Sequence, residues 1–251
     1  MRAKRRKGQV LVIAALVIAL ALLSTQAYIY TLSRTEVHSG YRFLSDYVQA
    51  IKIGSEHTVT ASLVNISRGG AYDNLQSNLD RGESFIAADY SMGQCSLNAT
   101  SASQSPYTQG IWLDWGTDSV GVSSAYSDFT LNIGGMGAEI DLSFSLNRTT
   151  RVVVTGSYSD LGGDTKEVTV VMYLFNEGAQ ALTNSTTLNY LKSSSWEDPT
   201  ILGDYVAVDY GNGTYHYTFT DTIPGNQVPV RVQTYDERGV FVQAEATLTE
   251  G

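Results

Sequence analysis

Five asparagines lie in the pattern Asn-x-Ser/Thr, which is the acceptor signal for N-linked glycosylation. Five exceeds the roughly two such patterns that chance predicts in a chain so rich in serine and threonine. The excess predicts an exported, glycosylated surface, whereas a serine- and threonine-rich β-protein that carries the pattern by accident is the alternative. The candidate glycosylation sites are Asn65, Asn98, Asn147, Asn184 and Asn212. Asn212 also lies in an Asn-Gly turn, where asparagine is favoured for its backbone conformation without any glycan.

Residues that could hold a metal or catalyse a reaction are few and scattered. His38, His57 and His216 lack the i, i+4 or His-x-His spacing that metal sites use. Cys95 is the only cysteine, which excludes a disulfide framework within the chain and any zinc site built from cysteines. We expect Cys95 to be a buried structural thiol. No Gly-x-Ser-x-Gly turn is present, so the sequence predicts no enzyme, no cofactor and no bound metal.

Acidic and aromatic clusters offer two weaker binding hypotheses. Carboxylates gather at 160–164, at 197–198 and at 236–237, and turn acids of this kind can bind Ca²⁺. None of these clusters matches an EF-hand loop, so we expect solvated turns. Several tyrosines and tryptophans could form a sugar- or protein-binding surface, but their strand spacing favours packing within sheets. These aromatic residues are Tyr205, Tyr210, Tyr215, Tyr217, Trp112, Trp115 and Trp196.

Charge and composition narrow the class of protein. The 251 residues carry a net charge of −9, although five of the 16 lysines and arginines lie within residues 1–8. The remainder is therefore strongly acidic, which argues against binding to nucleic acid. Charged residues make up only 16% of the chain, while glycine and tyrosine are abundant. This composition is typical of β-structure with many turns.

The N-terminal region predicts a single membrane-spanning segment. Fourteen consecutive apolar residues, Val10 to Leu23, would span about 21 Å as a helix, short of the roughly 30 Å of a bilayer core. Extension to Leu32 reaches the required length, with tyrosines at 28 and 30 near the outer interface. The cations precede the apolar run, so we expect a cytoplasmic N-terminus and an extracellular body at the cell membrane.

The start of the chain resembles a known export signal. A basic run at Lys4–Lys7 ends in Gly8 and Gln9, and the apolar run follows it. This order is similar to the class III signal peptide of type IV pilin-like proteins. The resemblance implies that a prepilin peptidase cuts between Gly8 and Gln9 and leaves the apolar helix on the mature protein. The fifth mature residue would be Ile13 rather than the common glutamate, which makes the start more similar to archaeal pilin-like proteins than to major bacterial pilins.

Other families and other processing routes fit the same residues. Tight-adherence pilus proteins share a basic, glycine and apolar start. An uncleaved signal anchor is one alternative to leader cleavage. An ordinary signal peptidase is another, because Thr25, Gln26 and Ala27 form a small-x-small site.

After the apolar run, the sequence predicts helices and then strands. Leu44, Tyr47, Val48 and Ile51 mark one helical face, and a second helix is expected over about 73–90, after a Gly69-Gly70 turn. From residue 94 the apolar period becomes two, with the longest alternation at 140–146. Seven further strands are expected after residue 150, at 151–158, 166–176, 185–191, 205–210, 214–220, 228–235 and 239–248.

The last hundred residues resemble immunoglobulin-like and fibronectin-III-like extracellular modules. The resemblance rests on Gly211 to Tyr217, Val230-Arg231-Val232 and Asp236 to Gly239, and implies a β-sandwich. The paired cysteines of antibody domains are absent. The predicted organisation is a basic leader (1–8), a transmembrane or pilin-core helix (9–32), a helical stalk (33–93), a β-rich region (94–150) and an Ig-like sandwich (151–251).

The predicted fold is therefore mainly β with an N-terminal helical part: a long hydrophobic and amphipathic helix followed by an Ig-like antiparallel β-sandwich. The expected function is that of a pilin-like cell-surface structural or adhesive protein, either a filament subunit or a minor pilin. It would form homo- or hetero-oligomers through the N-terminal helix and could bind a surface glycan or protein. The alternative is a non-polymerising, membrane-anchored extracellular binding module, and an exported hydrolase is the least favoured class.

Overall fold

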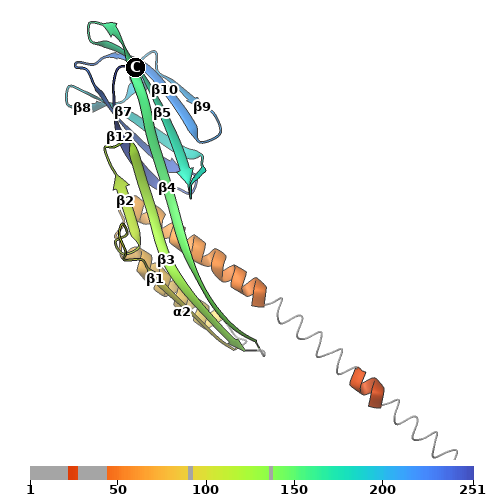
Figure 1. Ribbon diagram of the computed structural model, residues 1–251. Coiled ribbons are helices and arrows are strands. Elements are labelled where there is room, and N and C mark those ends of the chain that lie inside the picture. Colours follow the sequence, from red (N-terminus) through yellow and green to blue (C-terminus); the bar gives the residue numbers. More distant parts are fainter. Residues whose placement is uncertain (1–21, 28–43, 90–92, 136–137) are drawn as a thin grey trace, which may run out of the picture. The chain divides into compact units, whose positions relative to one another are not determined.

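A computed structural model describes residues 22–27, 44–89, 93–135 and 138–251 (Figure 1). The chain divides into two compact units, residues 1–52 and 53–251. Residues 22–27 are helical, and Leu22 and Leu23 are exposed. None of the helices among the described residues has the length and apolar character needed to cross a membrane. The predicted leader, and all of the predicted span except 22–27, fall outside the described residues.

Two helices follow, and both agree with the predicted apolar faces. The first covers residues 44–67 and passes Gly54 without a break. Its buried side chains include Ile51, Val59 and Leu63, which recur at the spacing of one helical face. After the Gly69-Gly70 turn, helix α2 (Asn74–Asp89) buries Leu75 and Leu79.

The unit 53–251 is mainly antiparallel β-structure arranged in two sheets, as predicted. The strand order in the larger sheet is β1-β3-β4-β5-β10-β9, with β2 beside β3 and β6 beside β5. The larger sheet contains β1 (Gln94–Ser101), β2 (Ile111–Trp115), β3 (Val120–Gly135), β4 (Ala138–Gly162), β5 (Thr165–Asn176), β6 (Ala179–Gln180), β9 (Val206–Asp209) and β10 (Thr214–Thr222). The smaller sheet, in the order β12-β11-β7-β8, contains β7 (Thr183–Lys192), β8 (Ser195–Glu197), β11 (Val228–Asp236) and β12 (Phe241–Leu248).

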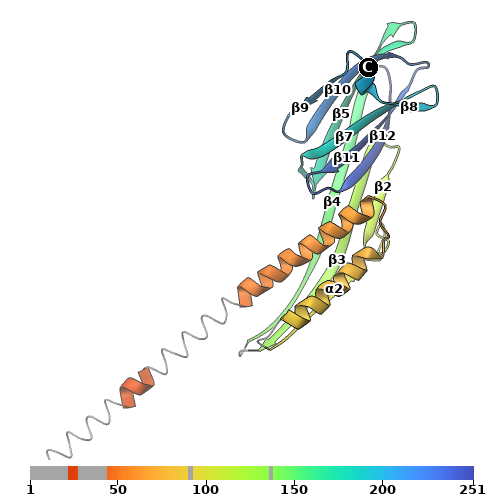
Figure 2. The same ribbon diagram turned by 180° about the vertical axis from the view of Figure 1, so that it is seen from behind.

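Strand β4 is the longest element of the larger sheet. It runs for 25 residues and pairs with β3 over its first part and with β5 over its second. The predicted boundary between a β-rich region and a sandwich, at residues 150/151, therefore falls inside one continuous strand. The predicted helical segment also packs on this sheet (Figure 2). Glu56 of residues 53–67 pairs with Arg148 of β4, and α2 contacts β1.

One face of the larger sheet, here called the inner face, packs against the smaller sheet at one end and against the helices at the other. In β4 the inner side chains are even-numbered: Val152 and Val154 are buried beneath the smaller sheet, and Leu142 and Phe144 are half-buried on the helix side. Figures 1 and 2 show the helices and the smaller sheet on the same side of β3 and β4. The inner face is thus covered by the smaller sheet and the helices, while no element among the described residues forms a second layer on the opposite, outer face.

A polar cluster joins the two sheets at the edge of the sandwich core. Tyr190 of β7 donates from Oη to Asp221 Oδ2 of β10 at 2.6 Å, and Lys192 Nζ lies 2.6 Å from the same oxygen. Burial disfavours the Asp221 carboxylate, but the hydrogen bonds from Lys192 and Tyr190 outweigh it and lower its pKa. Burial and the bond to Asp221 raise the pKa of Tyr190 well above its ordinary value.

This cluster predicts a loss of stability in alkali. Tyr190 would ionise in the unfolded chain near its ordinary pKa of 10.0 but remain protonated in the fold, so the folded state loses stability as pH rises above about 10. We expect Tyr190→Phe to cost about 1.5–3 kcal/mol at pH 8, because a hydrogen bond to a charged group is lost. That difference should shrink above pH 10. Urea unfolding of both proteins between pH 8 and pH 11 tests this, and a constant difference would contradict it.

Candidate functional site

The outer face of the β1-β3-β4 sheet presents rows of short polar side chains. Successive side chains point to opposite faces of its strands, so that Leu97 and Leu131 point inward while Asn98 and Thr130 point outward. Opposed outward residues form cross-strand rows of amide, hydroxyl and carboxylate groups. The rows are Ser96–Asn132–Asp141, Asn98–Thr130–Ser143 and Thr100–Asp128–Ser145.

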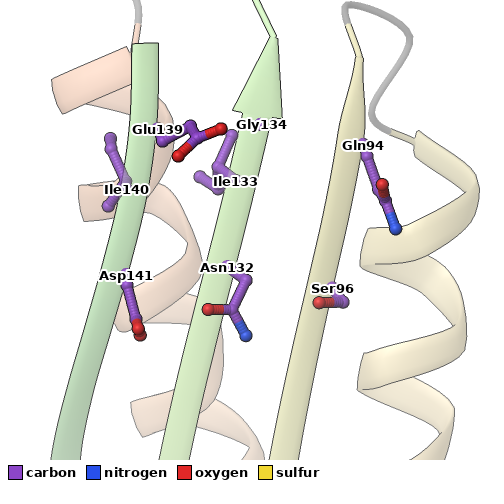
Figure 3. Close-up of a pocket in the computed structure, with 8 residues that line it drawn as sticks. All are labelled: Gln94, Ser96, Asn132, Ile133, Gly134, Glu139, Ile140 and Asp141. Carbon is purple, nitrogen blue, oxygen red and sulfur yellow. The ribbon is translucent and has the colours of Figure 1, made fainter.

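A groove of about 550 Å³ lies at the end of these rows (Figure 3). Gln94 of β1, Gly134 of β3 and Glu139 of β4 form its outermost row. Gly134 has no side chain, and a Cβ at this position would meet nothing within 4 Å, so the row is hollow at its centre. Figure 3 shows the Glu139 carboxylate extending toward Gly134. The other lining residues are Ser96, Asn132, Ile133, Ile140 and Asp141.

The groove offers hydrogen-bonding chemistry. Glu139 and Asp141 are exposed acceptors, whereas the amides of Gln94 and Asn132 both donate and accept. Such groups suit a ligand with several hydroxyl or amino groups. Both carboxylates lie in an open groove, which suits a reversibly bound ligand. In the described part of the chain, no group of three or more His, Cys, Asp and Glu side chains is placed to hold a metal ion.

An aromatic cluster occupies the same outer face near the middle of β3. Tyr107 lies 5.6 Å from Tyr126 and 6.3 Å from Trp112 between ring centroids. The Tyr107 hydroxyl bonds to Ser124 Oγ at 3.1 Å and donates to Asn147 Oδ1 at 3.4 Å. All three rings are half-buried, so they leave apolar surface beside polar groups. Aromatic faces next to amides and hydroxyls are typical of surfaces that bind sugars or peptides.

No known family model and no curated protein matches the chain.

All five candidate glycosylation sites are exposed to solvent. By contrast, four of the six other asparagines, at 74, 78, 176 and 189, are half-buried. Asn98 and Asn147 project from the outer face, and Asn184 is the second residue of β7. Asn65 lies near the end of the first helix and accepts from Asn74 Nδ2 at 2.7 Å. Each site is placed where a glycan would meet solvent rather than core.

The remaining candidates are dispersed. His57 is exposed and His216 half-buried on separate elements, while His38 and the processing residues Gly8 and Gln9 lie outside the described residues. Cys95 is buried, as predicted. Of the predicted aromatic surface, Tyr215 and Tyr217 are buried in the sandwich core and Tyr210 is exposed.

One acidic turn differs from the expectation. Asp236 was expected in a solvated turn but has no exposed surface, because it accepts hydrogen bonds from Thr150 and Arg238. The groove residues of β1 and β3 were not anticipated from the sequence. A signal was present, since Gln94–Ser101 alternates small apolar and polar residues, but its apolar members Cys95, Leu97 and Ala99 are mostly small.

Proposed function

We propose that this protein is a pilin-like cell-surface structural or adhesive protein, a filament subunit or minor pilin whose body is an Ig-like β-sandwich module. The observation that carries the proposal is the amphipathic helix downstream of the apolar run. Within residues 53–67, Val59, Leu63 and Ile66 are buried, and the helix is fastened to the β-structure by polar contacts. A hydrophobic helix that continues into one packed on a β-rich head is the plan of type IV pilin-like proteins.

The polar contacts occur at both ends of this packed segment. Glu56 pairs with Arg148 of β4 at 2.6 Å. Arg68 donates through Nε and Nη2 to the Gly239 carbonyl at 3.0 and 2.7 Å. A helix tied in this way is a rigid part of the head, which suits a subunit that transmits load from an assembled N-terminal helix.

The outer face and the exposed glycosylation sites support a location on the cell surface. A broad face of hydroxyl and amide groups without a catalytic constellation suits contact with glycans or proteins. The same features suit the second candidate, a membrane-anchored binding module that does not polymerise. The exposed groove and aromatic cluster favour that alternative, because a filament is not needed to present them.

The N-terminus of the native protein distinguishes these functions. We expect intact mass and N-terminal sequencing of a sheared surface-filament fraction to find a chain that starts at Gln9. Added mass on tryptic peptides that contain the five sites would report the glycans. Gly8→Val should block cleavage and remove the protein from the filament fraction, whereas Gly40→Val should leave processing unchanged. A chain that begins at Met1 or Arg2 and stays in the membrane would favour the anchored module.

A further inference from the structure

The two edges of the β1-β3-β4 sheet differ in the contacts that the described residues make with them. On the β1 edge, side chains from α2 occupy the outward backbone groups of Ala99 and Ser101. Gln76 donates to the Ala99 carbonyl at 3.0 Å and accepts from Ser101 N at 2.9 Å, while Glu83 accepts from Ala99 N at 2.5 Å. These bonds block the addition of another strand at this edge.

On the β4 edge, the backbone groups of Thr149 are occupied, just before the point where β5 begins to pair with β4. Thr149 N donates to Glu177 Oε1 at 3.0 Å, and the Thr149 carbonyl accepts from Glu177 N at 3.0 Å. Both backbone groups of Thr149 therefore point away from β3. Strand β4 pairs with β3 without a register shift from Ala138 to Val153. Every second residue between Ala138 and Thr149 therefore also points its N–H and C=O groups away from β3.

From Glu139 to Asn147, no described strand pairs with this edge. Strand β5 begins to pair with β4 only at Thr150. Within the described residues, no partner bonds to the outward backbone groups of Glu139, Asp141, Ser143, Ser145 and Asn147. Unpaired backbone groups along a regular edge are a template for another strand.

The side chains of this edge indicate which strand would fit. On the inner side lie Ile140, Leu142, Phe144 and Leu146, all half-buried, and on the outer side lie polar residues. The carboxylates Glu139 and Asp141 lie at one end of the strand, and Arg148, which pairs with Glu56, lies at the other. An antiparallel copy of the same strand would match apolar with apolar on the inner side and would keep the acidic ends of the two strands apart.

We propose that the β4 edge, residues 139–147, pairs antiparallel with the same edge of a second copy of this chain, centred on Ser143. In this register Ser143 faces its counterpart, Asp141 faces Ser145 and Glu139 faces Asn147 of the other copy. Each of these pairs exchanges two backbone hydrogen bonds, and no two carboxylates face each other. On the inner side, Leu142 meets Phe144 of the second copy, so the two half-buried apolar rows cover each other.

The pairing fixes the relative direction of the two copies. Arg68 lies at the β11–β12 turn and Glu56 lies farther along β4, toward the β3–β4 turn. The helix therefore enters the unit from the side of that turn. Antiparallel pairing sets the two β3–β4 turns at opposite ends, so the two chains enter from opposite sides. The proposed pairing does not depend on whether the leader is cut.

Cysteine cross-linking of the full-length protein in detergent micelles tests the register. Ser143→Cys would place two thiols across a hydrogen-bonded pair with Cα atoms about 5.5 Å apart, within disulfide range. Thr130→Cys is the matched control, because Thr130 is the cross-strand neighbour of Ser143 and would lie about 14 Å from its counterpart, three strand spacings away. We expect oxidised dimer for Ser143→Cys only. Equal cross-linking of both variants, or none of Ser143→Cys above wild type, would overturn the proposal.

A charge test addresses the same contact without oxidation. Ser143→Lys sets two ammonium groups opposite each other and should weaken the dimer at least tenfold. Ser145→Lys sets an ammonium group opposite Asp141 and should leave the dimer intact or strengthen it. Sedimentation of both full-length variants gives the dimer fractions. Equal weakening by the two lysines would show that the edge does not pair in this register.

Discussion

Replacement of Asp236 by alanine should lower the free energy of unfolding by about 3–5 kcal/mol, because one partner of a buried ion pair is removed. Asp236 has no exposed surface. Its Oδ2 accepts from Arg238 Nε at 2.8 Å and from Thr150 Oγ1 at 2.9 Å, while its Oδ1 accepts from Val240 N at 2.8 Å. Alanine would leave all three donors without this acceptor.

The effect should be large because Asp236 connects distant parts of the unit. Arg238 also donates to Glu177 Oε1 at 2.7 Å, and Glu177 in turn accepts from Thr149 N. Burial disfavours the Arg238 charge, but the bonds to Glu177 and Asp236 outweigh it and raise the pKa of the guanidinium. Once Asp236 is lost, that charge stays half-buried with one carboxylate instead of two.

Glu237→Ala provides the matched control for this prediction. Glu237 is the adjacent acid in the same turn but is exposed, so its removal should change stability by less than about 0.5 kcal/mol. Asp236→Asn keeps one acceptor oxygen and should fall between the two. Urea unfolding of the full-length chain, followed by tryptophan fluorescence, measures all three. A similar effect of Asp236→Ala and Glu237→Ala would show that the network contributes little.

Asp236 also illustrates what could not be predicted from the sequence. In the sequence it belongs to an acidic turn, and such turns are usually solvated. Its burial depends on Thr150, which lies 86 positions away, and on Arg238, whose orientation depends on Glu177. Local patterns carry no information on contacts of that separation. The turn position of the acidic clusters was predicted correctly, but the solvent exposure predicted for Asp236 was wrong.

The elements themselves were more predictable, because hydrophobic period reports burial directly. The predicted strand at 228–235 matches β11, and the predicted helix at 73–90 matches α2. Strand β1 lies in the predicted β-rich region, but its bounds were not predicted because its inward residues are mostly small. The length of β4 was missed because its continuity depends on pairing with β3 and then β5. The groove was missed for the same reason, since it requires β1, β3 and β4 to be aligned in register.

Replacement of Gly121 by alanine should destabilise the protein by about 3 kcal/mol, because two backbones meet at this residue. Gly121 lies in β3, opposite Val152 of β4. A Cβ at Gly121 would lie 1.9 Å from the Gln243 carbonyl oxygen of β12 and 3.1 Å from Val152 Cγ1. A backbone oxygen cannot rotate out of the way as a side chain can, so β12 would have to move.

That movement would open the sandwich at a point where its two sheets are joined. Ser119 N donates to the Glu245 carbonyl at 2.9 Å, and Glu245 N donates to the Gly116 carbonyl at 3.1 Å. Displacing β12 from Gly121 would stretch both bonds. The need for glycine here comes from close approach and not from backbone conformation, since Gly121 is not among the glycines with positive φ.

Gly134→Ala is the control within the same strand. A Cβ at Gly134 meets nothing within 4 Å, and its backbone is likewise not in the positive-φ region. Alanine there should change stability by less than about 1 kcal/mol and can stabilise the fold by restricting the unfolded chain. Thermal and urea unfolding of the two variants compare the positions directly. Equal destabilisation would mean that glycine is needed along β3 for a reason other than the approach of β12.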